Sequence, residues 1–171
     1  MKRLYLLRHA KSSWDEPGLA DRERPLAPRG RKAAKRIAAY LRREDATPSV
    51  VLCSSSVRTR QTLAAILPAL DGDPEVLVEE GLYAAGADTL LARIRAVPPE
   101  ADSVLLIGHN PGIGDLALSL AGGGDVDALG RLADGFPTGA LATFTVAADA
   151  WDALAAGGAE LTAYVVPREL S

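Results

Sequence analysis

The chain has two histidines, and both follow short apolar segments of the kind that form buried strands. His9 comes after residues 2–7 (KRLYLL) and Arg8, and His109 comes after residues 103–107 (SVLLI) and one glycine. A neutral imidazole is a good nucleophile toward phosphorus when its other ring nitrogen donates to a backbone carbonyl. We therefore predict that His9 is a nucleophile. For either histidine alone, a ring that only satisfies a strand-end carbonyl is the alternative.

An arginine near the start of a predicted helix adds a second feature of a phosphoryl-transfer site. Arg58 lies in the segment SVRTRQT, residues 56–62. An arginine in the first turn opposes the helix dipole, and a bound anion would explain its presence. Arginine forks match the oxygens of a phosphoryl group. We predict that Arg8, Arg58 and His109 hold the group that His9 attacks. A solvated helix face is the alternative for Arg58, and for Arg60 we prefer this alternative.

Segments with strand and helix patterns alternate along the chain, which predicts how these residues are positioned. We predict strands at residues 2–7, 49–53, 75–78, 103–107, 140–146 and 161–166. Helices are predicted after Gly30, after Ser56, before Pro98, and from Asn110 as N-cap and Pro111 as first residue to about Ala121. We interpret residues 11–28 and 121–127 as loops. This order predicts an α/β fold, a three-layer α/β/α sandwich with a mostly parallel central sheet and its site at the carboxyl ends of strands.

The bulk properties of the chain limit its partners and its surroundings. Its 171 residues predict a single domain, residues 1–171. The net charge of −3 has the wrong sign for general nucleic-acid affinity, and no apolar run approaches the roughly 20 residues of a membrane span. Charged residues interrupt the apolar N-terminal run before it reaches signal-peptide length, and Cys53 is the only cysteine. We predict a cytoplasmic protein with no nucleic-acid partner and no membrane partner.

Three segments together carry a resemblance to a known family: RHAKSSW (residues 8–14), SSSVRTRQT (54–62) and IGHNPG (107–112). In this order they resemble the histidine phosphatase superfamily, whose fold is called phosphoglycerate-mutase-like. Within it, the chain looks most like the short SixA-type phosphohistidine phosphatases. The compact length, the RHAKS form of the first segment, the pattern Asp21-x-x-Arg24-Pro25-Leu26 and residues 137–140 (PTGA) carry this closer likeness.

The resemblance implies roles for particular residues. It makes His9 the transiently phosphorylated nucleophile, with Arg8, Arg58 and His109 as the phosphate pocket. In the mutase-like relatives a carboxylate protonates the leaving oxygen, and Glu80, three residues before a tyrosine, matches their E-x-x-Y pattern. A surface carboxylate is the alternative for Glu80. Lys11 and Ser12 border the predicted site and are candidates for substrate contact, with a solvated loop as the alternative.

We predict from this a phosphatase that hydrolyses phosphohistidine or a small phosphoester without a metal or other cofactor. Its partner would be a phosphorylated protein or a small phosphorylated molecule. A mutase acting on a small phosphorylated metabolite is an alternative, although the chain has little room for segments that enclose a substrate. A non-catalytic phosphate-binding signalling module is another alternative. A metal site on the two histidines lacks a clustered set of further ligands.

Overall fold

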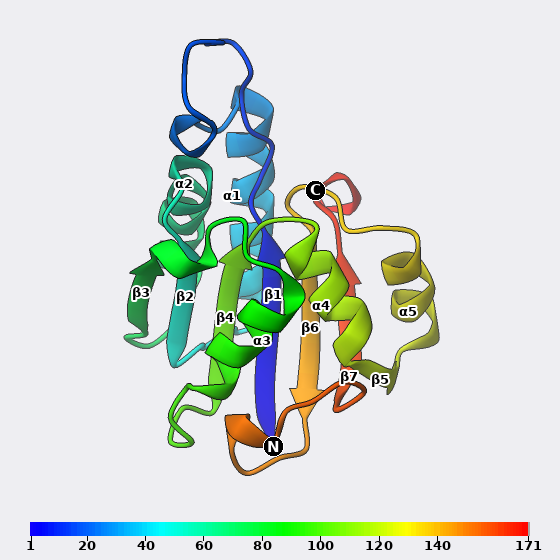
Figure 1. Cartoon of the computed structure of the whole chain (residues 1–171). Helices are drawn as coiled ribbons and strands as arrows, with labels where there is room; N and C mark the ends of the chain where they lie inside the picture. The colour runs from blue at the N-terminus through cyan, green and yellow to red at the C-terminus, as the bar shows by residue number, and fades with distance from the viewer. Residues whose placement is uncertain (171) are drawn as a thin grey trace.

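A seven-stranded sheet forms the centre of the computed structural model, which describes residues 1–170 (Figure 1). The strands stand in the order β3-β2-β4-β1-β6-β7-β5. Their bounds are β1 Lys2–Arg8, β2 Val50–Ser54, β3 Glu75–Glu79, β4 Ser103–Gly108, β5 Ala121–Gly124, β6 Leu141–Val146 and β7 Ala159–Val165. Each of the six predicted strands is present, with ends within two residues of the predicted ones.

The sheet is mostly parallel, as predicted. β1 pairs in parallel with β4, β4 with β2, and β2 with β3, whereas β6 is antiparallel to both β1 and β7. β7 in turn pairs in parallel with β5. Among the strands of residues 1–170, β6 alone therefore runs antiparallel to the others. The carboxyl ends of β1, β4 and β2 lie side by side.

Helices cover both faces of the sheet. Their bounds are α1 Pro28–Arg43, α2 Val57–Ile66, α3 Ala87–Arg95, α4 Gly112–Leu120 and α5 Val126–Ala133. In Figure 1, α3 and α4 lie in front of the sheet and α1 lies behind it. Short 3-10 turns complete the described elements: η1 Asp21–Glu23, η2 Leu67–Ala69, η3 Glu80–Leu82, η4 Trp151–Ala153 and η5 Pro167–Glu169.

The apolar side chains of β1 pack into two separate hydrophobic clusters, one on each face of the sheet. Tyr5 and Leu7 pack with Ile37 of α1 in one cluster, whereas Leu4 and Leu6 belong to the cluster on the other face. Successive side chains of a strand point to opposite faces, and a run that is apolar at every position is stable only where both faces are covered. The predicted three-layer α/β/α sandwich is thus confirmed.

Two predicted features were wrong. Residues 121–127 are not a loop, because β5 and the start of α5 occupy them. The glycines of β5 carry no side-chain alternation, and α5 is short, with the Asp125 carboxylate accepting from Ala128 N at 2.9 Å as its N-cap. The helix predicted to begin at Pro111 begins at Gly112, with Pro111 itself in the N-cap position.

The loop at residues 11–28 projects from the body of the molecule beside α1 and α2 (Figure 1). Its two ends are joined at its base, where Ala27 N donates to Lys11 O at 2.9 Å and Ser13 N donates to Pro25 O at 2.8 Å. Gly30 of α1 sits against the same segment, because a Cβ atom there would lie 2.0 Å from Lys11 O. The absence of a side chain at Gly30 lets α1 approach the chain that follows His9.

Within residues 1–170, no helix combines the length and the apolar character needed to cross a membrane.

We predict that Gly30→Ala lowers the free energy of unfolding by about 1–3 kcal/mol, because the new methyl group forces the Lys11 backbone away from α1. Urea denaturation measures this change. Gly130→Ala is the matched control: Gly130 lies inside α5, where an added methyl group would meet no other atom within 4 Å. That change should raise stability by up to about 1 kcal/mol. Equal stabilities of the wild type and Gly30→Ala would contradict the close packing of α1.

Candidate active site

The two histidines are brought together by the pairing of β1 with β4. Arg8 stands opposite Gly108 in the parallel register, so both strands end at the same level and each is followed by its histidine. His9 N donates to Gly108 O at 3.2 Å, and the two imidazole centroids are 5.3 Å apart. Each histidine is only 5% exposed. The structure therefore places His9 and His109 in one buried site, as predicted from the strand ends.

The backbone fixes the orientation of His9. Its Nδ1 lies 2.7 Å from Ala10 O, so Nδ1 carries the proton and donates to this carbonyl. Burial lowers the pKa of His9 to about 3, and the positive charges of Arg58 and Arg8 act in the same direction, although the Ala10 bond opposes them. His9 is thus neutral near pH 7, with the lone pair of Nε2 available.

Arg58 of α2 links the two imidazoles. Its Nε donates toward His9 Nε2 at 3.4 Å, and its Nη2 lies 3.4 Å from His109 Nδ1. A guanidinium has only donors, so both of these ring nitrogens act as acceptors. Arg58 is 7% exposed and lies in the first turn of α2, as predicted. The same guanidinium can therefore face an anion bound between the two rings.

The other ring nitrogen of His109 is held by the end of β2. Ser54 Oγ lies 2.7 Å from His109 Nε2, which carries the ring proton because Nδ1 accepts from Arg58. Burial lowers the pKa of His109 to about 4, with Arg58 adding to the effect and Asp21 opposing it. The position of Ser54 before a helix is typical of a helix cap, but Ser56 caps α2 instead.

Arg8 supplies a second cation to the site. Its Nη1 donates to Phe136 O at 3.1 Å, whereas its buried Nε has no hydrogen-bond partner among residues 1–170. Burial, together with the charge of Arg58, lowers the pKa of the Arg8 guanidinium. Buried donors are nearly always paired in folded proteins, so this N–H is a donor suited to an anion.

Asp21 is a positioning residue that the sequence analysis did not identify as part of the site. Its carboxylate accepts from Arg58 Nη2 at 3.0 Å and from Arg24 Nη1 at 2.9 Å, and it also accepts from the Tyr83 hydroxyl. The Tyr83 bond, followed by Arg58 and Arg24, holds the pKa of Asp21 below its usual range. In the sequence, the motif Asp21-x-x-Arg24 is the signal for this contact.

One pocket of about 240 Å³ is lined by all four residues predicted to bind and transfer the phosphoryl group: Arg8, His9, Arg58 and His109. Lys11 and Ser12, predicted to border the site, also line it, and Ser12 Oγ accepts from Arg24 Nη2. Further lining residues that the sequence analysis did not assign to the site are Trp14, Arg24, Asn110 and Thr138. Within residues 1–170, no three His, Cys, Asp or Glu side chains gather in a way that could hold a metal ion.

Glu80 lies apart from this group. Its side chain is 73% exposed, and Oε1 accepts from Arg22 Nη1 at 2.9 Å and from Ser55 Oγ at 3.3 Å. It is not among the residues that line the pocket. Tyr83, three residues later, does reach the site, with its ring 5.3 Å from that of His109 in an edge-on arrangement. The role of Glu80 as a proton donor stays a prediction.

This arrangement is suited to metal-free phosphoryl transfer. One neutral imidazole presents a lone pair, and two guanidinium groups and a second imidazole surround it. Fixed cationic donors stabilise the negative charge that a transferring phosphoryl group spreads over its three equatorial oxygens.

Comparison with known proteins agrees with this geometry. The model of the histidine phosphatase superfamily (branch 1) matches residues 4–85. A protein assigned as the phosphohistidine phosphatase SixA of Nakamurella multipartitia is 33% identical in sequence. Its solved structure superposes with a TM-score of 0.80 over 97% of this chain and 96% of that one. The chain belongs to the histidine phosphatase superfamily.

Two more relatives extend over nearly the whole of this histidine phosphatase. The structure of a protein assigned as SixA of Agrobacterium tumefaciens is 32% identical, with a TM-score of 0.82 over 97% of this chain and 98% of that one. An uncharacterised protein of Mycobacterium leprae is 38% identical over 167 residues, which are 95% of this chain and all of that protein. The resemblance predicted from the three segments is confirmed.

The two buried histidines make the stability of this histidine phosphatase depend on pH. Their pKa values fall from 6.5 in the unfolded chain to about 3 and about 4, so the unfolded chain alone takes up protons below pH 6.5. Stability from both residues is full above pH 6.5 and is lost as pH falls toward the folded values. As pH is lowered from about 7 to about 5, each histidine should reduce the free energy of unfolding by about 2 kcal/mol.

Urea denaturation at the two pH values tests this prediction in the wild type and in His109→Asn. The variant should lose about half as much stability as the wild type over this interval. Asp21 does not interfere, because its pKa lies below the ordinary 3.8 and its contribution is lost only at lower pH. The same pH dependence in both proteins would show that His109 is not buried in the neutral form.

Proposed function

We propose that this chain is a phosphatase that hydrolyses phosphohistidine or a small phosphoester through a covalent phosphohistidine intermediate on His9. The observation that carries the proposal is that both ring nitrogens of His9 have defined partners. Nδ1 of His9 is bound to Ala10 O, while Nε2 is the acceptor that faces Arg58. A nucleophile needs this defined tautomer and a cation beside the reacting atom.

In the first step, the Nε2 lone pair of His9 attacks phosphorus in line, and the bond from phosphorus to the leaving group breaks. The leaving group departs with the electron pair and takes up a proton. Arg8 and Arg58 donate to the equatorial oxygens. The Nδ1 proton stays bonded to Ala10 O, which stabilises the positive charge that develops on the ring.

His109 changes its protonation state in this scheme. A phosphoryl dianion beside the ring favours the charged imidazolium and so raises its low pKa. The protonated ring then donates from Nδ1 to the phosphoryl oxygen, while its Nε2–H still donates to Ser54 Oγ. In the second step, water attacks phosphorus, the bond to Nε2 breaks, and its electron pair returns to His9. Phosphate leaves with the oxygen and one proton of the water, and the other proton goes to solvent, which balances the proton taken up by the leaving group in the first step.

The relatives support the choice of reaction. The two solved structures described above are assigned as phosphohistidine phosphatases, and this chain covers nearly all of each. We propose that residues 1–171 act as one catalytic domain in the cytoplasm, with a phosphorylated protein or small molecule as substrate. The pocket at the strand ends is formed by segments from Arg8 to Thr138, so the site requires most of the chain.

The first test replaces the nucleophile. His9→Ala should lose at least about a thousandfold in kcat on p-nitrophenyl phosphate and on a phosphohistidine protein domain, because no other group can form the covalent intermediate. Arg60→Ala is the control, since Arg60 lies on the exposed side of α2. Rapid quench of the wild type with labelled substrate should leave acid-labile label on the protein. Unlabelled protein during turnover would refute the covalent mechanism.

A second test separates Glu80 from the rest of the site. A proton donor matters for an alkoxide leaving group and little for a nitrophenolate. If Glu80 is the donor, Glu80→Gln should lose about a hundredfold in kcat on an alkyl phosphate and stay near the wild type on p-nitrophenyl phosphate. Glu79→Gln is the neighbouring control, because Glu79 binds Arg93 instead. Unchanged rates of Glu80→Gln on both substrates would remove Glu80 from the mechanism.

A further inference from the structure

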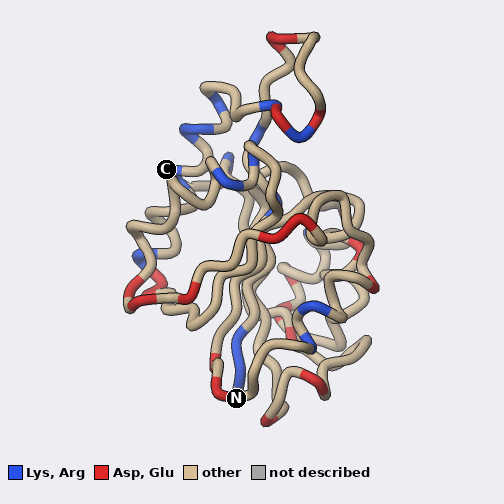
Figure 2. Tube along the Cα trace, turned by 60° about the vertical axis from the view of Figure 1, so that its left-hand side comes forward, with Lys and Arg blue, Asp and Glu red and all other residues tan. Residues whose placement is uncertain are grey.

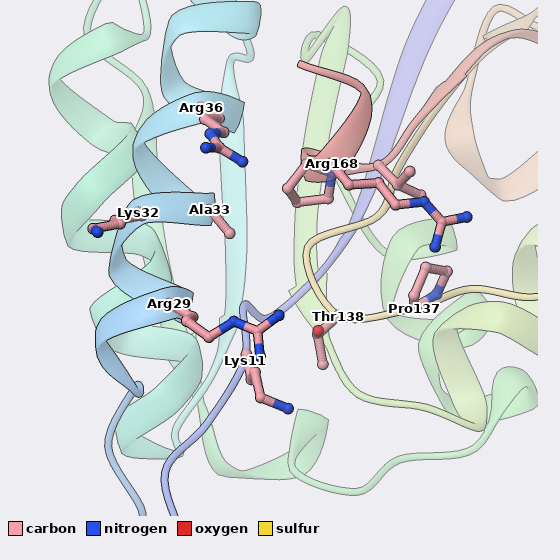
Figure 3. Close-up of a pocket in the computed structure, with 10 residues that line it drawn as sticks. Lys11, Arg29, Lys32, Ala33, Arg36, Pro137, Thr138 and Arg168 are labelled. Carbon is pink, nitrogen blue, oxygen red and sulfur yellow. The ribbon is translucent and has the colours of Figure 1, made fainter. Parts of the chain in front are cut away.

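A second hollow opens beside the phosphoryl pocket. This basic groove, of about 300 Å³, lies between α1 and the segments at residues 137–138 and 166–168 (Figure 3). Lys11 and Thr138 line both the groove and the phosphoryl pocket, so the two hollows share a border. Nothing in the proposed mechanism uses the groove.

Cationic side chains dominate its rim. Arg29 and Arg36 come from α1, and Figure 3 shows both on the groove side of the helix, with Lys11 below Arg29 and Arg168 across the gap. Lys32 also contributes to the lining, although its amine points away. Within residues 1–170, the side chains of these five residues have no ion pair and no hydrogen bond.

This charge stands out against the rest of the protein. The chain has a net charge of −3, yet α1 carries seven Lys and Arg residues and no Asp or Glu. Arg29 lies in the first turn of α1, where a positive charge opposes the helix dipole. Figure 2 shows Lys and Arg gathered near the C-terminal end of the chain, with Asp and Glu mostly lower in the molecule and in the projecting loop. A group of like charges without partners repels itself and attracts ions of the opposite sign.

The lining of the groove also has an apolar part. It consists of Ala33 from α1 and of Pro137, Val166 and Pro167 from the other segments. An apolar lining with cations at its rim fits a molecule with a carbon body and an anionic end. The hollow is also bounded on two sides, as sites for small molecules usually are.

We propose that the basic groove is a second anion subsite, which holds a second phosphate of a small organic substrate while the first phosphate reacts at His9. This inference rests on the proposed phosphatase activity, and it assigns the substrate class: small molecules with two separated phosphate groups. Arg29 and Arg36 are seven residues apart, which is about 10 Å along a helix, so the groove extends along α1. Because the groove and the phosphoryl pocket are distinct hollows that meet at Lys11 and Thr138, the second phosphate is joined to the reacting one by a chain or ring that passes Lys11.

Lys11 is well placed for this position between the two hollows. Its backbone is fixed on α1 through the Ala27 bond and the close approach of Gly30, so its side chain starts from a defined point. It contributes to the lining of both hollows without a partner of its own among residues 1–170. Because Lys11 lies between the two hollows, its positive charge favours substrates that carry one negative group in the groove and another in the phosphoryl pocket.

The test compares alkane-α,ω-diol bisphosphates with alkyl monophosphates of the same length. For at least one length, the wild type should hydrolyse the bisphosphate with a kcat/KM at least about tenfold higher, because each charge-assisted hydrogen bond adds affinity. Arg29→Gln/Arg36→Gln should reduce this ratio below about threefold. Arg31→Gln/Lys35→Gln removes the same charge from exposed positions of α1 outside the groove, and should leave the ratio unchanged.

Calorimetric titration with alkane-α,ω-bisphosphonates and alkylphosphonates measures the groove without turnover. Tighter binding of the bisphosphonates that is lost in Arg29→Gln/Arg36→Gln supports the subsite, even if His9 chemistry fails its own test. Equal kcat/KM for both substrate series, with p-nitrophenyl phosphate still hydrolysed, overturns the subsite and leaves the phosphatase proposal intact. A loss in Arg29→Gln/Arg36→Gln that is confined to a phosphohistidine protein domain also overturns it, because the groove would then dock a protein.

Discussion

The register of β1 against β4 is the constraint on which the active site depends. Arg8 lies opposite Gly108, so the residue after each strand is a histidine and the two rings meet at 5.3 Å. A shift of one residue would turn Leu4 and Leu6 to the wrong core layer and would carry His9 away from His109. The same apolar packing that stabilises the sandwich therefore also sets the position of His9, the proposed nucleophile.

Charge and burial then act together on these rings. Arg8 and Arg58 would attract a phosphoryl group, and they also suppress protonation of the two imidazoles that share the site with them. Asp21 partly offsets the positive charge of this cluster, because its carboxylate accepts from Arg58 Nη2. Nε of the same guanidinium still points toward His9. His9, the proposed nucleophile, thus stays neutral in a site that is positively charged overall.

The sequence was sufficient for those parts of the site that follow from local pattern. Arg8, His9 and His109 adjoin apolar strands, and Arg58 lies in the first turn of the helix that follows another strand. Because the carboxyl ends of parallel strands lie at the same edge of the sheet, these four residues are expected to lie close together. Asp21 and Tyr83 could not be found in this way, because their contacts depend on how the loop at residues 11–28 folds back. Ser54 does stand at a strand end, but a serine before a helix is typical of a cap, and this pattern hid its contact with His109. In β5 and α5, glycines and short length removed the periodic signal that revealed the other elements.

The chemistry and the proposed choice of substrate are built on different parts of the fold. The reacting groups stand at strand ends and in the first turn of α2, where backbone pairing fixes them within the sandwich. The basic groove is formed by exposed side chains of α1, by Lys11, by residues 137–138 and by the chain near its C-terminus, and it shares only Lys11 and Thr138 with the phosphoryl pocket. Substitutions in the groove can therefore alter which substrate is bound while the geometry at His9 is preserved, because the two sets of residues touch only at that border.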